Sequence, residues 1–351
     1  NIAMDEGSVN RAYERDFFPY GRPLVSGIYY VGVYNWSTTD PISYKIQSRC
    51  VGESGSGADF KVEELAFDAD SGDSTSDISG LRPREAAYFE VEVPEGKRSW
   101  RLRLENTEAE TCLVVRKDYL PAFNTFENAD ADSNGGTPAR EGVLMQRDGD
   151  EIYTLLPANR QGTIDSGTYY LAVVGMGSDG TPTALGSGNA AATITSEGEL
   201  NVDGLGSLPS NSPIETSIAL QPGEVQLYEF EVTDSPEVLE VRLDNRTGEP
   251  RFGLLHTPDG DTRIPHPSFV NRDDRYGIDK GSTPEWSGNQ IVTLLNPANG
   301  VYTLTLRASP SGGQLLNATA DLVISTRQVS ELGFSPGSAF ASNTISDSLL
   351  D

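Results

Sequence analysis

The chain has 351 residues and a net charge of −26, from 52 acidic and 26 basic side chains. A negative surplus of this size repels nucleic acid and anionic membrane surfaces, so neither is expected as a partner. Because domains usually contain ~100 to 150 residues, the length predicts more than one domain. The 36 Gly and 21 Pro residues indicate many turns, which favours short strands over long helices.

Residues 1–52 are expected to be the C-terminal part of a β-sandwich module. Their clearest strand covers residues 28–33 and follows a Ser-Gly pair. Residues 52–57, Gly-Glu-Ser-Gly-Ser-Gly, have the composition of a flexible linker. No stretch of the chain reaches the ~18 apolar residues of a membrane helix, so membrane insertion is not expected.

Residues 60–198 are predicted to form a complete sandwich module. The segment Tyr-Phe-Glu-Val-Glu-Val at residues 88–93 alternates apolar and polar side chains, the pattern of a strand with one buried face. Trp100 opens a second alternating segment and is expected in the core. Pro-Glu-Gly at residues 94–96 separates the two segments with residue types that turns require.

Residues 199–329 are predicted to repeat this module. Arg-Leu-Arg-Leu-Glu-Asn at residues 101–106 matches Glu-Val-Arg-Leu-Asp-Asn at an offset of 139, and the same offset aligns Ile-Tyr-Thr-Leu-Leu with Ile-Val-Thr-Leu-Leu at residues 291–295. Agreement in order, spacing and residue type is typical of an internal repeat. Residues 200–212, rich in Gly, Ser and Pro, are expected to join the modules, and residues 330–351 to begin a further segment or linker.

Two segments of the repeat resemble the bacterial pre-peptidase C-terminal domain family. Gln-Pro-Gly-Glu-Val-Gln-Leu-Tyr-Glu-Phe-Glu-Val at residues 221–232 is similar to the segment that opens such a domain, and Gly-Val-Tyr-Thr-Leu-Thr-Leu at residues 300–306 is similar to its closing strand. The resemblance implies an all-β fold of tandem, jelly-roll-like, antiparallel β-sandwich modules. In that family, such modules are appended to secreted proteases and other extracellular proteins, where they aid secretion, bind polymeric substrate or space domains.

No catalytic residues are predicted, and the chain is not expected to be an enzyme. Its two histidines, His256 and His266, lie in Pro-rich segments, and no Gly-x-Ser-x-Gly nucleophile motif precedes a helix. Two histidines cannot supply a His-rich zinc site, and the zinc motif His-Glu-x-x-His is absent from the sequence.

Calcium is the cofactor for which the sequence offers ligands. Asp68, Asp70 and Asp73 lie in one short segment, and Asp130 and Asp132 repeat the alternation. Clustered loop carboxylates can supply the oxygen ligands of calcium. With 52 acidic residues in the chain, Asp-rich turns are expected anyway as plain solvated surface, so both interpretations stay open.

Two tryptophans are candidates for a binding surface. Trp36 and Trp286 lie in polar turns, where an exposed ring could stack on a sugar or anchor the local structure.

Cys50 and Cys112 are the only cysteines and form either a disulfide or two thiols. The repeat aligns Cys112 with Arg251, outside the inward-facing Leu113 and Val115, so Cys112 is expected on the outward face. There it would either bond to Cys50 and staple the preceding partial module, or be an exposed thiol.

Together these features predict a non-catalytic, extracellular or cell-surface repeat region of a larger protein, acting in structure, adhesion or assembly. Its partners would be neighbouring modules, other subunits or an extracellular matrix polymer. In one variant, incomplete end modules are completed by strand donation between subunits. The alternative is an accessory region of a secreted hydrolase that binds protein or polysaccharide.

Overall fold

The computed structural model describes most of residues 62–327, together with Ile28, Thr39 and Pro41. The described ranges are 62–83, 85–118, 120–121, 143–145, 149–157, 161–178, 187–208, 212–257, 263–265, 285–308 and 316–327, without the side chains of 285–289 and 327. Within these ranges the chain forms strands and no helix. The predicted all-β class is therefore confirmed, whereas the predicted 1–52 and 330–351 segments lie almost wholly outside the described residues.

The first module contains strands β1 to β9. Their bounds are β1 (Val62–Leu65), β2 (Thr75–Leu81), β3 (Ala86–Val93), β4 (Trp100–Glu108), β5 (Glu110–Lys117), β6 (Val143–Met145), β7 (Glu151–Leu155), β8 (Gly167–Gly177) and β9 (Ala190–Gly198). They form a five-stranded sheet in the order β1-β3-β8-β5-β6 and a four-stranded sheet in the order β2-β9-β4-β7.

The second module contains strands β10 to β18. Their bounds are β10 (Val202–Leu208), β11 (Ile214–Leu220), β12 (Val225–Val232), β13 (Val238–Thr247), β14 (Pro250–Thr257), β15 (Glu285–Asn289), β16 (Ile291–Leu295), β17 (Gly300–Ala308) and β18 (Ala318–Arg327). The two sheets have the orders β10-β12-β17-β14-β15 and β11-β18-β13-β16.

Both modules have the same topology. Counted from the first strand of each module, the orders are 1-3-8-5-6 and 2-9-4-7 in both, which is the arrangement of a jelly roll with one added edge strand. The predicted tandem jelly-roll sandwiches are thus confirmed. One pair in each module, β1 with β3 and β10 with β12, is parallel rather than antiparallel, because the chain crosses to the opposite sheet and back between the two strands.

The first module is built around Trp100, which has no exposed surface. Its ring packs against Phe67, Tyr153 and Tyr169, with centroid distances of 6.5, 6.1 and 5.2 Å. The indole Nε1 donates a hydrogen bond to Ser196 Oγ (2.8 Å), which in turn donates to the carbonyl of Phe67 (2.6 Å). The prediction that Trp100 is a core residue is confirmed.

The second module has its own core. Phe230 of β12 stacks on Tyr302 of β17 at 5.5 Å, and the two residues face each other across neighbouring antiparallel strands. The opening and closing segments that resemble the pre-peptidase C-terminal family are therefore adjacent strands, paired from Val225 with Arg307 to Val232 with Gly300.

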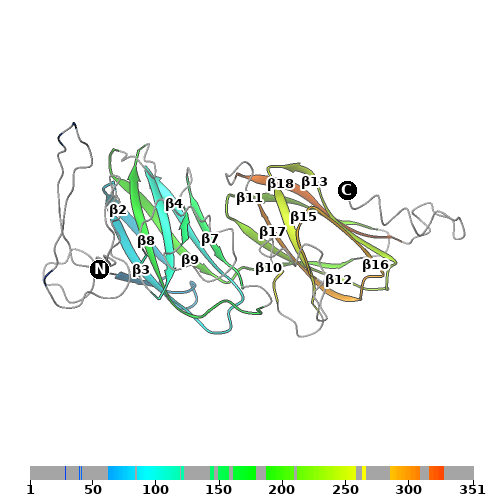
Figure 1. Ribbon diagram of the computed structural model, residues 1–351. Helices are drawn as coiled ribbons and strands as arrows, with labels where there is room; N and C mark the ends of the chain where they lie inside the picture. The colour runs from blue at the N-terminus through cyan, green and yellow to red at the C-terminus, as the bar shows by residue number, and fades with distance from the viewer. Residues whose placement is uncertain are drawn as a thin grey trace, which may run out of the picture.

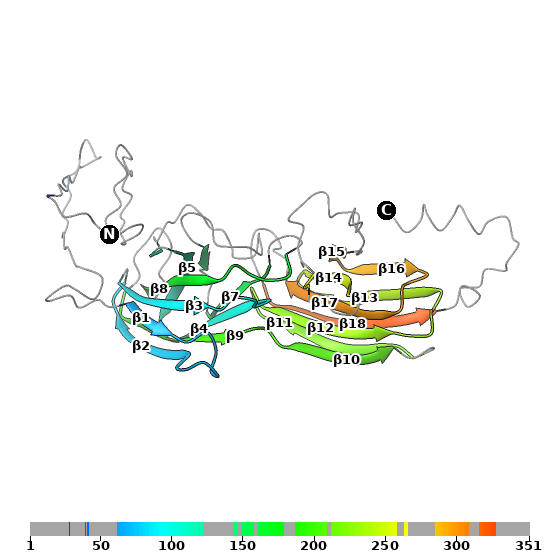
Figure 2. The same ribbon diagram turned by 90° about the horizontal axis from the view of Figure 1, so that it is seen from below.

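The modules follow one another along the long axis of the molecule (Figure 1), and the same succession is visible after a quarter turn (Figure 2). Only Glu199, Leu200 and Asn201 lie between β9 and β10. The expected join at residues 200–212 is therefore wrong in part, since residues 202–208 form an edge strand. Its glycines fit a register shift against β12 between Gly204 and Ser207.

Candidate functional site

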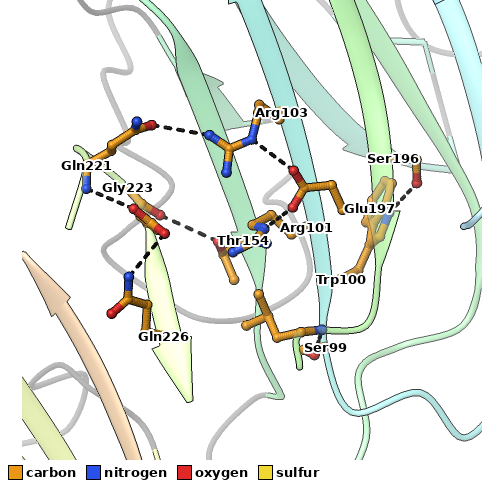
Figure 3. Close-up of polar contacts among 12 residues, drawn as sticks. Ser99, Trp100, Arg101, Arg103, Thr154, Ser196, Glu197, Gln221, Gly223 and Gln226 are labelled. Atoms are coloured by element: carbon orange, nitrogen blue, oxygen red, sulfur yellow. Dashed lines mark hydrogen bonds and ion pairs between the residues drawn. The ribbon is translucent and has the colours of Figure 1, made fainter. Parts of the chain in front are cut away.

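The candidate site is a polar site that lies where the modules meet, beside β4 and β9 of the first module. Leu102 of β4 is buried in the core, so its neighbours Arg101 and Arg103 point to the other face of the sheet. Both guanidinium groups donate to the carboxylate of Glu197 on β9, with Arg103 Nε at 2.8 Å from Oε1 (Figure 3). One carboxylate thus holds two arginines in place.

Two hydrogen bonds cross from this face to the second module. Arg103 Nη1 donates to Oε1 of Gln221 at 3.2 Å. Thr154 of β7 donates from Oγ1 to the carbonyl oxygen of Gly223 at 3.4 Å (Figure 3). Both acceptors belong to the turn at residues 221–224. The first module therefore binds this turn through one side chain and one backbone carbonyl.

The turn that accepts these bonds is rigid for local reasons. Glu224 N donates to the carbonyl of Gln221 at 3.0 Å, which closes a four-residue turn. Pro222 stands at its second position and Gly223, with φ of 79°, at its third, as a type II turn requires. The carboxylate of Glu224 also accepts from Gln221 N at 2.9 Å, so the turn keeps its shape without help from outside.

Below the polar contacts lies an apolar cluster shared by the modules. Leu156 follows β7 and packs with residues of the linker and of the second module, namely Leu200, Val202, Val225, Leu227 and Ile264. Leu156 is 4% exposed and Leu227 2% exposed. Because these side chains are withdrawn from water only where the modules meet, the hydrophobic effect favours the joined arrangement.

The short linker is itself fixed to the first module. Glu199 accepts from the backbone N of Arg98 at 2.8 Å and from Lys97 Nζ at 3.3 Å. The backbone N of Leu200 donates to Ser99 Oγ at 2.9 Å. With Glu199 and Leu200 both bound to the first module, the linker has little freedom to change the angle between the modules.

Charge pairing decides the protonation of this site. Partial burial raises the pKa of Glu197, but the hydrogen bonds and positive charges of Arg103 and Arg101 outweigh it, so its pKa lies below the ordinary value. For Arg103, burial acts to lower the pKa, and the bond to Glu197 with the surrounding carboxylates raises it overall. Glu197 and Arg103 are therefore both charged at neutral pH.

This joint was not predicted from the sequence. In the sequence, Arg103, Thr154 and Leu156 stand out only as members of the repeat, and Gln221 and Gly223 only as part of the 221–232 segment. Inter-domain contacts of modest size allow relative motion by default. Here a three-residue linker, the shared apolar cluster and the two crossing hydrogen bonds act together, so the arrangement can hold one orientation of the two modules.

The predicted calcium ligands Asp68, Asp70 and Asp73 lie in and after a turn that follows β1. Asp68 Oδ1 accepts from the backbone N of Ser71 at 2.8 Å, and this hydrogen bonding lowers its pKa. Asp68 also packs on Gly198, where an added Cβ would lie 2.6 Å from Asp68 Cβ. In the part of the chain that the structure describes, no three His, Cys, Asp or Glu side chains are grouped to hold a metal ion, and calcium binding stays a prediction.

The other predicted site residues are mostly beyond the described part of the chain. Trp36, Cys50, Asp130 and Asp132 lie outside the described residues. Trp286 belongs to β15, but its side chain is not among those described. The carbohydrate-binding surface, the second calcium cluster and the Cys50–Cys112 disulfide therefore remain predictions.

Cys112 lies on β5 and has no exposed surface. It belongs to a second apolar cluster, with Ala86, Tyr88, Val114, Leu144, Ala172, Val174 and Met176. Its neighbours Leu113 and Val115 belong to the core between the sheets, so Cys112 faces away from that core, as expected. The alternative of an exposed thiol is wrong, because this outer face is itself apolar and buried.

Comparisons with known proteins add little to this description. No protein-family model matches the chain, and no curated protein matches it in sequence. Among solved structures, 39% of the chain matches 98% of CorA, a surface-associated copper-binding protein of Methylomicrobium album BG8, at 11% identity and a TM-score of 0.23. The CUB1-EGF-CUB2 region of human MASP-1/3 matches over 100% of its length and 73% of this chain, at 9% identity and a TM-score of 0.17. A secreted protein of Eubacterium rectale matches over 70% of its length and 69% of this chain, at 10% identity and a TM-score of 0.17.

Similarities at this level carry no functional argument, so the class of the protein follows from its own fold. The chain is a tandem of two jelly-roll modules of equal topology, joined through a built interface. No described segment forms a helix of the length and hydropathy that crossing a membrane requires.

Proposed function

We propose that the chain is a non-catalytic structural region of a larger extracellular or cell-surface protein. In this role, tandem sandwich modules set the distance and direction between the parts that they connect. The joint carries the proposal, because Leu156 packs into the second module while Arg103 and Thr154 bind the Gln221–Glu224 turn. A protein that needs only a flexible tether does not need such contacts.

Two features of the chain support the extracellular setting. Residues 221–232 and 300–306 resemble modules that are appended to secreted proteins. The net charge of −26 keeps an extended surface solvated and discourages non-specific association. Neighbouring modules, other subunits or a matrix polymer are the partners that suit such a region.

The fixed joint is tested by measuring the distance between the modules. Spin labels are carried by unnatural amino acids at Glu64 and Glu215, which are exposed on β1 and β11, and pulsed dipolar spectroscopy gives the distance distribution. A single narrow distribution is expected, and Thr154→Arg should broaden it by forcing the turn at Gly223 away. A broad distribution in the unchanged chain would exclude a spacing role.

The accessory-region alternative has its own readout. The chain is mixed with insoluble cellulose, chitin and gelatin, and the protein left in solution is measured. Depletion by one of these polymers would favour a substrate-binding region of a hydrolase. A chain that stays in solution, with a narrow distance distribution, agrees with the structural role.

A further inference from the structure

Strand β16 of the second module occupies the place that β7 occupies in the first. β7 pairs with β4 so that Ile152 faces Arg103, and β16 pairs with β13 so that Ile291 faces Arg242. The strand ladders thus align Thr154 with Thr293 and Leu156 with Leu295, in agreement with the offset of 139 residues. The two outer strand faces can therefore be compared residue by residue.

The two equivalent faces differ sharply in exposure. On the first module Thr154 is 8% exposed and Leu156 4% exposed, and both are covered by the second module. On β16 the side chain of Thr293 is exposed, while Ile291 is 54% and Leu295 63% exposed. The surface that the first module uses for docking is thus present on the second module and uncovered.

Exposure of this kind is unusual within the described chain. Only four large apolar side chains of the described residues are exposed, and Ile291 and Leu295 are two of them. They lie four residues apart on one strand and therefore on the same face. Apolar side chains that are grouped on an otherwise polar surface mark a contact site.

The polar part of the docking surface is repeated as well. Arg242 stands where Arg103 stands in the first module, and its side chain is 31% exposed. Its Nε donates to Asp244 at 2.8 Å and its Nη1 to Glu240 at 2.5 Å. A guanidinium has five N–H donors, so Arg242 keeps donors for an acceptor such as the one that Gln221 offers to Arg103.

We infer that the outer face of β16 docks a further sandwich module of the same repeat. That module would seat a Pro-Gly turn and the first apolar residues of its third strand there, as the second module seats Gly223, Val225 and Leu227 on the first. This inference goes beyond the proposed structural role, since an accessory binding region could be extended in the same way. Contacts of this head-to-tail type propagate without closing.

The course of the chain favours a module that follows β18. Val238 pairs with Leu295 on one side and with Arg327, the end of β18, on the other. The chain therefore leaves the sheet two strands away from Leu295. In the first module the chain leaves β9 at Gly198, and two residues later Leu200 packs with Leu156.

A second copy of the chain fits less well as the occupant. The surface of the first module that corresponds to Val225 and Leu227 is formed by Ala86 and Tyr88, since Tyr88 pairs with Val62 as Leu227 pairs with Val202. Ala86 and Tyr88 are 5% and 2% exposed. That surface is not open to a partner, whereas the one on β16 is.

The test uses the whole chain with its own second module as the docking probe. Leu156→Asp places an unpaired charge in the shared cluster but outside the core of the first module, so it should open the joint and free the surface at Val225 and Leu227. Each chain then carries two uncovered surfaces, the one at Val225 and Leu227 and the outer face of β16. We expect a dissociation constant of ~100 μM, a weak affinity that suits a small interface. Sedimentation equilibrium should therefore show an average mass that at least doubles as the concentration rises severalfold above this value.

Control variants separate this contact from non-specific association. Adding Ile291→Asp and Leu295→Asp to Leu156→Asp should restore the monomer at every concentration. Adding Leu316→Asp, at a residue that is 50% exposed near the opposite end of β18, should leave the association unchanged. Thr154→Arg is a second way to open the joint if Leu156→Asp does not fold.

Two outcomes would overturn the inference. An opened and folded variant that stays monomeric at ~500 μM, well above the expected dissociation constant, would show that the β16 face does not bind the surface at Val225 and Leu227. Association that persists after Ile291→Asp and Leu295→Asp would place the contact elsewhere. Neither outcome touches the proposed spacing role, which is decided by the distance distribution of the unchanged chain.

Discussion

Leu156 and Leu295 stand at the same position of the two modules, yet Leu156 is 4% exposed and Leu295 is 63% exposed. The residue type is identical and the strands that lead to it are equivalent in the two modules, so the difference comes from the neighbour that each module has. The pair therefore allows the same substitution to be compared at a leucine that is buried at the joint and at an equivalent leucine that is exposed.

Leu156→Ala should destabilise the chain far more than Leu295→Ala. Removing a buried leucine loses its transfer free energy and leaves a cavity, which costs about 2 kcal/mol or more, whereas an exposed leucine contributes within roughly 0.5 kcal/mol. Calorimetric unfolding of both variants measures the difference. Equal midpoints for the two variants would mean that the apolar cluster does not hold the modules together.

Ser196→Ala should destabilise the first module through a group that it leaves without a partner. Ser196 Oγ accepts from the indole of Trp100 and donates to the carbonyl of Phe67, and all of this lies in the core. Loss of the hydroxyl strands a buried donor, at a cost of about 1 to 3 kcal/mol. Urea unfolding followed by tryptophan fluorescence measures it.

Thr195→Ala provides the comparison on the same strand. Thr195 shares a hydrogen bond of 3.3 Å with Thr75 at the surface, where water can replace the lost partner. The expected change is within roughly 0.5 kcal/mol. If both variants unfolded at the same urea concentration, the indole of Trp100 would have to find another acceptor.

Acid should weaken the joint through Glu197. Its pKa is lower in the folded chain than the ordinary value of 4.5, so the unfolded chain binds the proton more tightly. The stabilising contribution is complete above pH 4.5 and is lost as the pH falls below that value through the folded pKa. The free energy of unfolding as a function of pH, measured for the unchanged chain and for Glu197→Gln, isolates this contribution.

The difference between the two chains should be largest near neutral pH and should shrink in the acid window. Glu95→Gln is the matched control for the loss of one carboxylate, because Glu95 is exposed in the turn after β3. A constant difference between the unchanged chain and Glu197→Gln across the window would assign the effect of Glu197 to packing instead of charge.

The sandwich strands were predictable because their signal is local. The alternation at residues 88–93 and the place of Trp100 depend only on which face of a strand meets the core, and the structure places Phe89, Val91, Val93 and Trp100 there. The single buried face is confirmed only in part, because Tyr88 on the opposite face is buried in the second apolar cluster. The edge strand at residues 202–208 carries an aspartate, a serine and two glycines among its seven residues, a composition that is typical of a loop. It forms a strand because a neighbouring backbone offers it hydrogen-bond partners.

The joint could not be predicted, since nothing local distinguishes its residues. Leu-Leu ends both matching segments, residues 152–156 and 291–295, and only the packing of one module on the next distinguishes Leu156 from Leu295. Cys112 illustrates the same point. Its outward direction follows from strand periodicity, but its burial depends on a second apolar cluster whose buried residues come from the four consecutive strands β3, β8, β5 and β6.

Calcium is the remaining prediction from the sequence, and calorimetry decides it. An ion that binds only the folded chain raises the unfolding midpoint in proportion to the logarithm of its concentration above the dissociation constant. If Asp68, Asp70 and Asp73 bind calcium, the midpoint rises with calcium, falls with a chelator, and loses this response in the triple Asp→Asn variant.

The contact of Asp68 with Ser71 complicates the triple variant, because Asp68→Asn also weakens the turn. Asp70→Asn with Asp73→Asn leaves that contact intact, so a calcium response that survives in this double variant would show that the two carboxylates are plain solvated surface.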